Sequence, residues 1–144
     1  MRMSRIIFNT ILLLTFILPA VSYAENTGKH KLVIQVSSSD AGTQKLALNN
    51  AVNVQKALGM DNVDVEIVAY GPGLGLLTMV SSQKDRVASL AMQNITFSAC
   101  GNTMKKIAKK SGKKPILIDG VKVVTAGVLR IMELQEQGYS YLRP

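Results

Sequence analysis

The stretch that decides the fold is Lys31–Leu58, which reads KLVIQVSSSDAGTQKLALNNAVNVQKAL. Its beginning, Lys31–Val36, is dense in β-branched residues and predicts a buried strand, which the polar turn Ser37–Asp40 ends. From Ala41 the apolar residues recur every three or four positions, which is typical of an amphipathic helix, and Gly59 supplies the expected stop. The stretch therefore predicts one strand followed by one helix.

The same alternation continues along the chain. Further strands are predicted at 63–70, 95–99 and 139–142, and helices at 82–92, 101–110 and 126–137, with one helical turn at 76–80. Two short strand candidates, 115–118 and 121–124, flank the turn signal Asp119-Gly120; either they form a hairpin or only the second joins the main sheet. In the last helix we expect Val128, Ile131 and Met132 inside and Arg130 and Glu133 outside. The alternation predicts a single α/β domain with a mostly parallel sheet.

The first 24 residues have a different composition from the rest. A short positive segment, Met1–Arg5, precedes the apolar run Ile6–Leu18, and the small residues Ser22 and Ala24 fit a cleavage site. The run is shorter than the roughly 20 residues that span a bilayer. We expect a cleaved signal peptide at 1–24, a flexible lead-in at 25–30 and the domain at 31–144. The protein would be periplasmic, without stable membrane insertion after cleavage; an uncleaved anchor is the alternative.

The composition excludes several classes of site. One Cys and one His among 144 residues allow no internal disulfide and no Cys/His zinc centre, and we expect no metal. The glycine cluster Gly71–Gly75 lacks the third glycine of a dinucleotide fingerprint and the Lys-Ser/Thr pair of a P-loop, so no cofactor is expected. The net charge is +8, but export and the absence of interleaved aromatic residues disfavour nucleic acid as the partner.

Cys100 is the strongest candidate for chemistry. In parallel α/β sheets, functional sites lie at the carboxyl ends of the strands, here Ser37–Asp40, Gly71–Gly75 and Cys100–Thr103. A thiol at the start of a helix lies beside unpaired N–H groups, which favour the nucleophilic thiolate. Persulfide transfer, mixed-disulfide exchange and oxidation by peroxide remain open; the alternative is an inert buried side chain. Candidate pocket residues are Gly71, Gly73, Gly75, Gly101, Asn102 and Thr103.

A run of lysines follows Cys100. Four of them fall on one side of the helix predicted at 101–110, and two more follow it. This face is a candidate for attracting an acidic partner protein or a small oxyanion. The alternative is an ordinary solvated face, and anionic lipid has no other support in the sequence. The candidate anionic-partner face consists of Lys105, Lys106, Lys109 and Lys110, and the two that follow are Lys113 and Lys114.

Four blocks in order resemble the DsrE/DsrF-like family, and in particular its exported single-domain members. The blocks are Leu46–Ala51, Asp61–Leu74, Ala99–Met104 and Gly138–Pro144. The resemblance implies a three-layer α-β-α domain with a mostly parallel sheet of about five strands and DsrE-like, flavodoxin-like topology. It also implies assembly into a homo-trimer or homo-hexamer. Sulfur-relay members hold a persulfide on a cysteine at a strand end, and Cys100 falls in the matching region.

The resulting hypothesis is a periplasmic sulfur-handling protein in sulfur relay or sulfur oxidation. Cys100 would be a persulfide or thiol-exchange carrier, at most a sulfurtransferase-like one. Its partners would be a sulfur donor or acceptor protein, or a small sulfur oxyanion. The alternative is a non-catalytic oligomeric binding or structural module in which Cys100 is buried and inert.

Overall fold

The computed structural model describes residues 28–144, so the expected signal peptide and the first half of the expected lead-in, 25–27, lie outside the described residues. Within 28–144, no helix is long and apolar enough to cross a membrane. The strands are β1 (His30–Val36), β2 (Val63–Ala69), β3 (Ile95–Cys100), β4 (Lys122–Val124) and β5 (Ser140–Leu142). The α-helices are α1 (Ala41–Leu58), α2 (Lys84–Ala91), α3 (Gly101–Ser111) and α4 (Gly127–Glu136), and the 3-10 helices are η1 (Met60–Asn62) and η2 (Gly71–Leu77).

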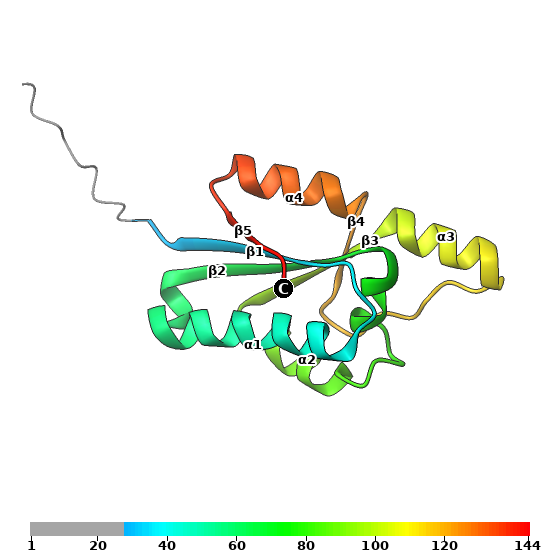
Figure 1. The fold of residues 1–144 in the computed structure, drawn as a ribbon, viewed down its shortest axis with the longest axis horizontal. Helices are drawn as coiled ribbons and strands as arrows, with labels where there is room; N and C mark the ends of the chain where they lie inside the picture. Colours follow the sequence, from blue (N-terminus) through cyan, green and yellow to red (C-terminus); the bar gives the residue numbers. More distant parts are fainter. Residues whose placement is uncertain (1–27) are drawn as a thin grey trace, which may run out of the picture.

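The five strands form one parallel sheet in the order β4-β3-β2-β1-β5. Helices α1 and α2 cover one face of the sheet and α4 covers the other, while α3 projects from the end of β3 (Figure 1). The predicted α/β class and three-layer architecture are confirmed. The expected flavodoxin-like topology is wrong in its strand order, because flavodoxin-like sheets run 2-1-3-4-5.

The structure decides between the two alternatives for the short strand candidates and corrects one boundary. Only the second candidate joins the sheet, as β4 beside β3, which confirms that alternative. The first contributes only an isolated antiparallel bridge between Leu117 and Thr78, so there is no hairpin. At the other end, His30 belongs to β1 rather than to the lead-in, because it pairs with Val63 of β2.

The glycine cluster is helical rather than a loop. Residues Gly71–Leu77 form η2, and the helical turn expected at 76–80 is therefore displaced toward the amino terminus. Gly73 packs so closely on the β1 end that an added Cβ would collide with the carbonyl oxygen of Val36. Only glycine fits at position 73, because the backbone of β1 leaves no room for a side chain.

Most of the core lies between the sheet and helices α1 and α2. Large buried side chains from three strands, among them Ile34, Ile67 and Phe97, pack there against Leu48 of α1 and Leu90 of α2. The opposite face has a much smaller apolar cluster, made by Val33, Val68, Ile131 and Leu134. The two faces of the sheet are therefore unequal in apolar content.

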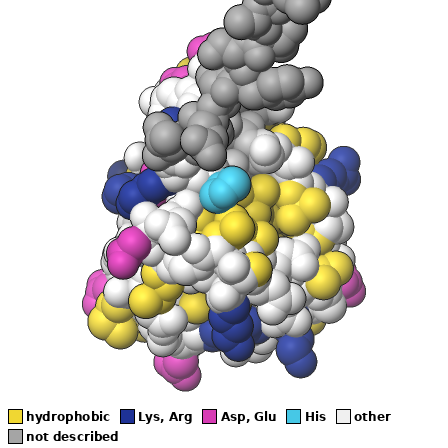
Figure 2. Space-filling view, turned by 90° about the vertical axis from the view of Figure 1, so that its left-hand side faces the viewer, with side chains coloured by type: hydrophobic (Ala, Val, Ile, Leu, Met, Phe, Trp, Pro, Cys, Tyr) yellow, Lys and Arg dark blue, Asp and Glu magenta, His cyan; other side chains and the backbone are white. Residues whose placement is uncertain are grey.

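The two ends of the sheet are also different. His30 lies at the amino-terminal end of β1, beside exposed apolar side chains (Figure 2). Cys100 closes the carboxyl-terminal end of β3. Since all strands are parallel, the single imidazole and the single thiol lie at opposite ends of the sheet, and a Cys–His catalytic pair is excluded within one chain.

Candidate functional site

Cys100 is both the last residue of β3 and the N-cap of α3. Its sulfur accepts a hydrogen bond from the backbone N–H of Thr103, with Sγ and N 3.5 Å apart. The side chain is buried, with 5% of the residue's surface exposed. A thiol therefore occupies the position that Ser, Thr, Asn or Asp usually takes at a helix start.

The surroundings favour the thiolate. Burial raises the pKa of Cys100, but hydrogen bonds from the Thr103 hydroxyl and from the backbone N–H groups of Thr103, Gly127 and Asn102 lower it more. The net result is a pKa below the ordinary value for a cysteine. Because the thiolate is the nucleophilic form, the geometry gives Cys100 more reactive character than an isolated buried thiol has.

The helix starts of α3 and α4 both face the sulfur. Gly127 is the first residue of α4, and its N–H is among the groups that stabilise the thiolate. An added Cβ at Gly127 would lie 2.9 Å from Cδ1 of Tyr70, so glycine is needed for this close approach. Neither Gly127 nor Tyr70 was predicted from the sequence as part of the site. A glycine at the start of a predicted helix was the available signal.

The candidate pocket residues divide into two groups. Asn102 and Thr103 lie in the first turn of α3, and the Gly71 N–H donates to the Thr103 hydroxyl oxygen at 2.9 Å. Gly73 packs against the end of β1, and Gly75 is exposed on η2. The structure thus brings Gly71 to the cysteine through Thr103, whereas Gly73 packs on β1 and Gly75 faces open space.

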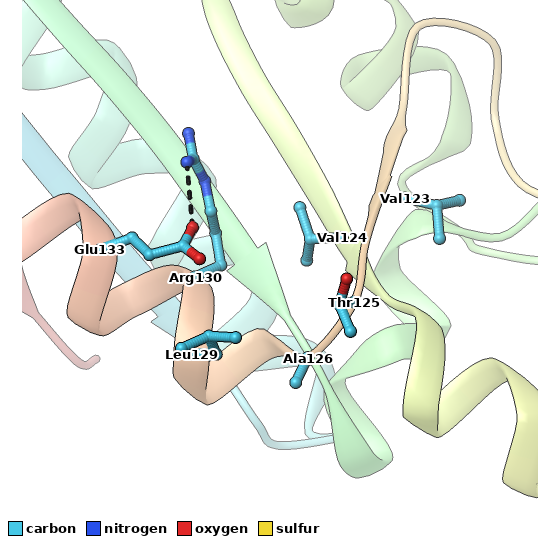
Figure 3. Close-up of a pocket in the computed structure, with 7 residues that line it drawn as sticks. All are labelled: Val123, Val124, Thr125, Ala126, Leu129, Arg130 and Glu133. Carbon is cyan, nitrogen blue, oxygen red and sulfur yellow. Dashed lines mark hydrogen bonds and ion pairs between the residues drawn. The ribbon is translucent and has the colours of Figure 1, made fainter.

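Two cavities lie on either side of β4. One, of about 250 Å³, lies against Gly101 and is lined by Met104, Lys105, Lys114 and Val123. The other, of about 230 Å³, lies between the β4 end and α4 (Figure 3). Arg130 and Glu133 line the second one, together with Val124 and Thr125. The first is the better candidate for an anionic ligand, because two ammonium groups and no carboxylate line it.

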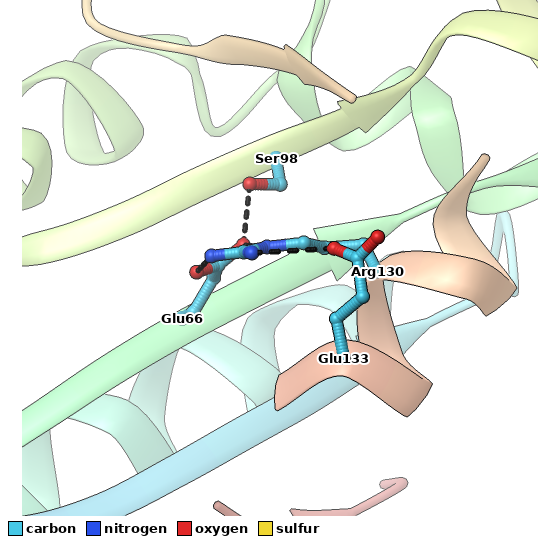
Figure 4. Close-up of polar contacts among 4 residues, drawn as sticks. All are labelled: Glu66, Ser98, Arg130 and Glu133. Carbon is cyan, nitrogen blue, oxygen red and sulfur yellow. Dashed lines mark hydrogen bonds and ion pairs between the residues drawn. The ribbon is translucent and has the colours of Figure 1, made fainter. Parts of the chain in front are cut away.

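A buried ion pair fastens α4 to the sheet. Glu66 of β2 accepts two hydrogen bonds of 2.8 Å from the Arg130 guanidinium and one of 2.7 Å from the Ser98 hydroxyl (Figure 4). The bonds to Glu66 raise the pKa of Arg130, although burial works in the opposite direction. Arg130 also contacts Glu133 at 3.4 Å.

This network corrects the expected orientation of the last helix. Arg130 reaches inward to Glu66, while Val128 and Met132 are exposed and only Ile131 of the expected inward set is buried. The reason is the buried carboxylate of Glu66, which requires a cationic partner. The sequence places Glu66 inside the strand predicted at 63–70 but does not indicate which face it lies on or which residue it pairs with.

The lysines of α3 are free of carboxylate partners. None of the ion pairs among residues 28–144 involves Lys105, Lys106, Lys109 or Lys110. No residue of α3 is fully buried, and the helix projects from the sheet (Figure 1). In the same part of the chain, no group of three His, Cys, Asp or Glu side chains could hold a metal ion.

Comparison with known proteins agrees with the fold. The model of the DsrE/DsrF-like family matches residues 30–144. The protein of unknown function MTH1491 from Methanobacterium thermoautotrophicum is similar in structure, with a TM-score of 0.72 and 32% identity over 81% of this chain and 100% of that one. The ychN protein from E. coli shares the fold, with a TM-score of 0.62 and 18% identity over 80% and 99%. No curated protein matches the chain.

Proposed function

The chain belongs to the DsrE/DsrF-like family, which is associated with sulfur transfer, and from this membership we propose that it is a periplasmic sulfur carrier. In this proposal Cys100 carries the sulfur as a persulfide, as a sulfurtransferase-like carrier does. The observation that supports it most is the position of the Cys100 sulfur at the starts of α3 and α4, where N–H groups lower its pKa.

The proposed reaction begins with the Cys100 thiolate. It attacks the outer sulfur of thiosulfate or a polysulfide and forms an S–S bond to it. The bond that this sulfur had to its donor breaks, and the electron pair leaves with sulfite or the shortened polysulfide. An acceptor thiolate then attacks the outer sulfur of the persulfide, and Cys100 is released as the thiolate. No net oxidation or reduction is needed.

The charge near the site suits such anions. Lys105 and Lys114 line the cavity that touches Gly101, the residue after Cys100. The remaining α3 lysines, Lys106, Lys109 and Lys110, extend the positive surface outward. We propose that this positive charge draws a small sulfur oxyanion into the cavity and toward the thiol.

The test is the mass of the intact protein after exposure to a sulfur donor. The chain from Glu25 onward is incubated with polysulfide or thiosulfate. We expect a gain of about 32 Da, one sulfur atom, that is absent in Cys100→Ser and reversed by a reducing thiol. Absence of the adduct, with a thiol that an alkylating agent reaches only after denaturation, would refute the carrier role.

Burial of Cys100 supports a second candidate, a non-catalytic oligomeric module. Several apolar side chains of α4 are exposed, namely Val128, Leu129 and Met132, and they form a surface suited to contact with further copies. We propose a homo-trimer or homo-hexamer in either case. A native mass equal to one chain would contradict it. The alkylation experiment separates the two functions, because an inert thiol is required only by the second.

The proposed compartment has its own test. If residues 1–24 are a cleaved signal peptide, protein recovered from the periplasmic fraction should begin at Glu25. An intact Met1 on protein in the membrane fraction would indicate the uncleaved anchor instead.

A further inference from the structure

We propose that the end of the molecule formed by α3 and the loop after it docks on the surface of an anionic phospholipid bilayer. The docking surface consists of two parts that are separate in the sequence. One part is an apolar tip, made by Met79, Val80 and Ile116. The other is the lysine cluster, which comprises Lys105, Lys106, Lys109, Lys110, Lys113 and Lys114.

The apolar tip exists because two loops pair. The Met79 N–H donates to the Ile116 carbonyl oxygen at 2.9 Å, next to the bridge between Thr78 and Leu117. Thr78 is buried and Leu117 is partly buried, but the tip residues are exposed: Val80 is 94% exposed, Ile116 is 74% exposed and Met79 is 47% exposed. The paired loops thus present three large apolar residues at the surface.

The lysine cluster adjoins this tip. Lys113 and Lys114 directly precede Pro115 and Ile116, and Lys114 shares a cavity wall with Lys105 of α3. The two segments that build the surface, 71–84 and 101–118, contain no Asp or Glu. Asp85 and Asp119 directly follow these segments, but none of the ion pairs among residues 28–144 involves a lysine of the cluster, so the surface carries a concentrated positive charge beside exposed apolar groups.

This combination fits a bilayer better than the other possible occupants. Apolar side chains that protrude beside lysines can enter the interface while the ammonium groups remain at the anionic headgroups. A second copy related by a two-fold axis would bring an identical positive cluster against the first, and the two would repel. An acidic protein would match the lysines but gives no role to side chains as exposed as Val80. Attachment is peripheral, so it requires no spanning segment.

The experiment measures binding to vesicles of phosphatidylcholine alone and of phosphatidylcholine mixed with phosphatidylglycerol. It uses the chain from Glu25, which lacks the apolar run that would bind lipid by itself. All strands lie within 30–144, and MTH1491, which aligns over its whole length with 81% of this chain, shows that a domain of this extent folds. We expect binding only to the mixed vesicles, weakened by added salt.

Matched variants test each part of the surface. Lys109→Gln with Lys110→Gln should lower the partition coefficient at least about tenfold, whereas the same change at Lys45 and Lys56 on α1 should not. Val80→Ser with Ile116→Ser should also lower it about tenfold. The controls for the apolar change are Met60→Ser and Met92→Ser, which replace exposed methionines elsewhere.

Three results would overturn the proposal. The first is no binding to the mixed vesicles at low salt. The second is binding that Val80→Ser with Ile116→Ser leaves unchanged while soluble polyglutamate competes fully, since that result indicates an acidic protein partner. The third is a loss of native oligomer mass in the same double variant, since that result places the tip between copies. Cys100→Ser should bind vesicles normally, so the outcome is independent of the sulfur-carrier role.

Discussion

The two faces of the sheet are built differently. The face under α1 and α2 is almost purely apolar, and residues such as Phe97 and Ile67 are completely buried in it. The face under α4 has four buried apolar residues and a buried ion pair, Glu66 with Arg130. By strand alternation, Cys100 belongs to the second face, since it follows Ser98 by two residues in β3.

The two faces therefore have different roles: one mainly stabilises the fold, and the other mainly sets the geometry of the site. Burial of apolar surface has no preferred direction. The α1/α2 face therefore contributes free energy of folding but tolerates small shifts of the helices on the sheet. The Glu66–Arg130 pair has a fixed bidentate geometry and holds α4 in one register on the sheet. Gly127, at the start of that helix, is thereby kept beside the Cys100 sulfur. The polar face is therefore the one that positions the thiol.

The largest effect on stability should come from the apolar face. Phe97→Ala removes a fully buried ring from between the sheet and the helices and should lower the free energy of unfolding by about 3–5 kcal/mol. Urea denaturation followed by circular dichroism measures it. The exposed control is Met92→Ala on α2's end, where we expect a change within about 0.5 kcal/mol. Equal losses would contradict the assignment of the main core to this face.

The second-largest loss of stability should follow substitution of Arg130, the cation on the α4 face of the sheet. Arg130→Met leaves the buried Glu66 carboxylate without a cation, with only the Ser98 hydroxyl donating to it, and should cost about 3 kcal/mol. Adding Glu66→Gln should recover part of this loss, because it removes the unpaired charge. Glu133→Gln alters only the exposed partner of Arg130, and a change within about 0.5 kcal/mol is expected from the same denaturation measurement. A double variant as unstable as the sum of its single changes would argue against the pair.

Gly127→Ala tests the contact between α4 and the site. The new Cβ would lie 2.9 Å from the Tyr70 ring, so either the ring or the helix start must move, at a cost of about 1–3 kcal/mol. We expect slower alkylation of Cys100 at neutral pH as well, since the Gly127 N–H would be displaced. The control is Gly75→Ala, where an added Cβ meets open space and both properties should stay near wild type.

The smallest effect on stability, and the most specific one, is expected at Thr103. Thr103→Val removes a hydroxyl that stabilises the Cys100 thiolate and accepts a hydrogen bond from the Gly71 N–H. The free energy of unfolding should therefore fall by about 1 kcal/mol. The pKa of Cys100 should rise, and the pH profile of its alkylation by iodoacetamide should move to higher pH. Thr103→Ser keeps the hydroxyl and should keep the wild-type profile. A profile that Thr103→Val leaves unmoved would exclude this hydrogen bond as a cause of the lowered pKa.

The lowered pKa of Cys100 also links stability to pH. Between the folded pKa and the higher ordinary pKa of the unfolded chain, the folded protein carries the thiolate and the unfolded chain carries the thiol. Because the unfolded state binds more protons in this window, the stability should rise with pH across it. The contribution is fully present above the unfolded pKa and is lost as the pH falls through the folded one. Cys100→Ser should abolish this slope in urea denaturation.

Most of the fold was predictable from local patterns. The strand–helix unit of residues 31–58 and the later alternation were confirmed because apolar spacing and turn residues act over short distances. The position of Cys100 between β3 and α3 was also predictable for the same reason. The strand order was not, since a parallel sheet can connect the same elements in more than one order.

The environment of the thiol was only half predictable. Asn102 and Thr103 follow Cys100 directly, and their N–H groups at a helix start can be inferred from the sequence. Gly127 approaches from a helix that begins 27 residues later, after an irregular return segment. Similarly, Glu66 and Arg130 are 64 positions apart, and nothing local indicates that they pair.

The sequence by itself determined the α/β class, the single thiol at a strand end and the run of lysines, because each depends on the order of neighbouring residues. The tertiary structure alone decided which helix starts face Cys100, which strand carboxylate needs Arg130, and that Met79 lies against Ile116. These contacts join segments far apart in the chain. Their geometry is fixed by how the layers pack, which no periodicity along the sequence records.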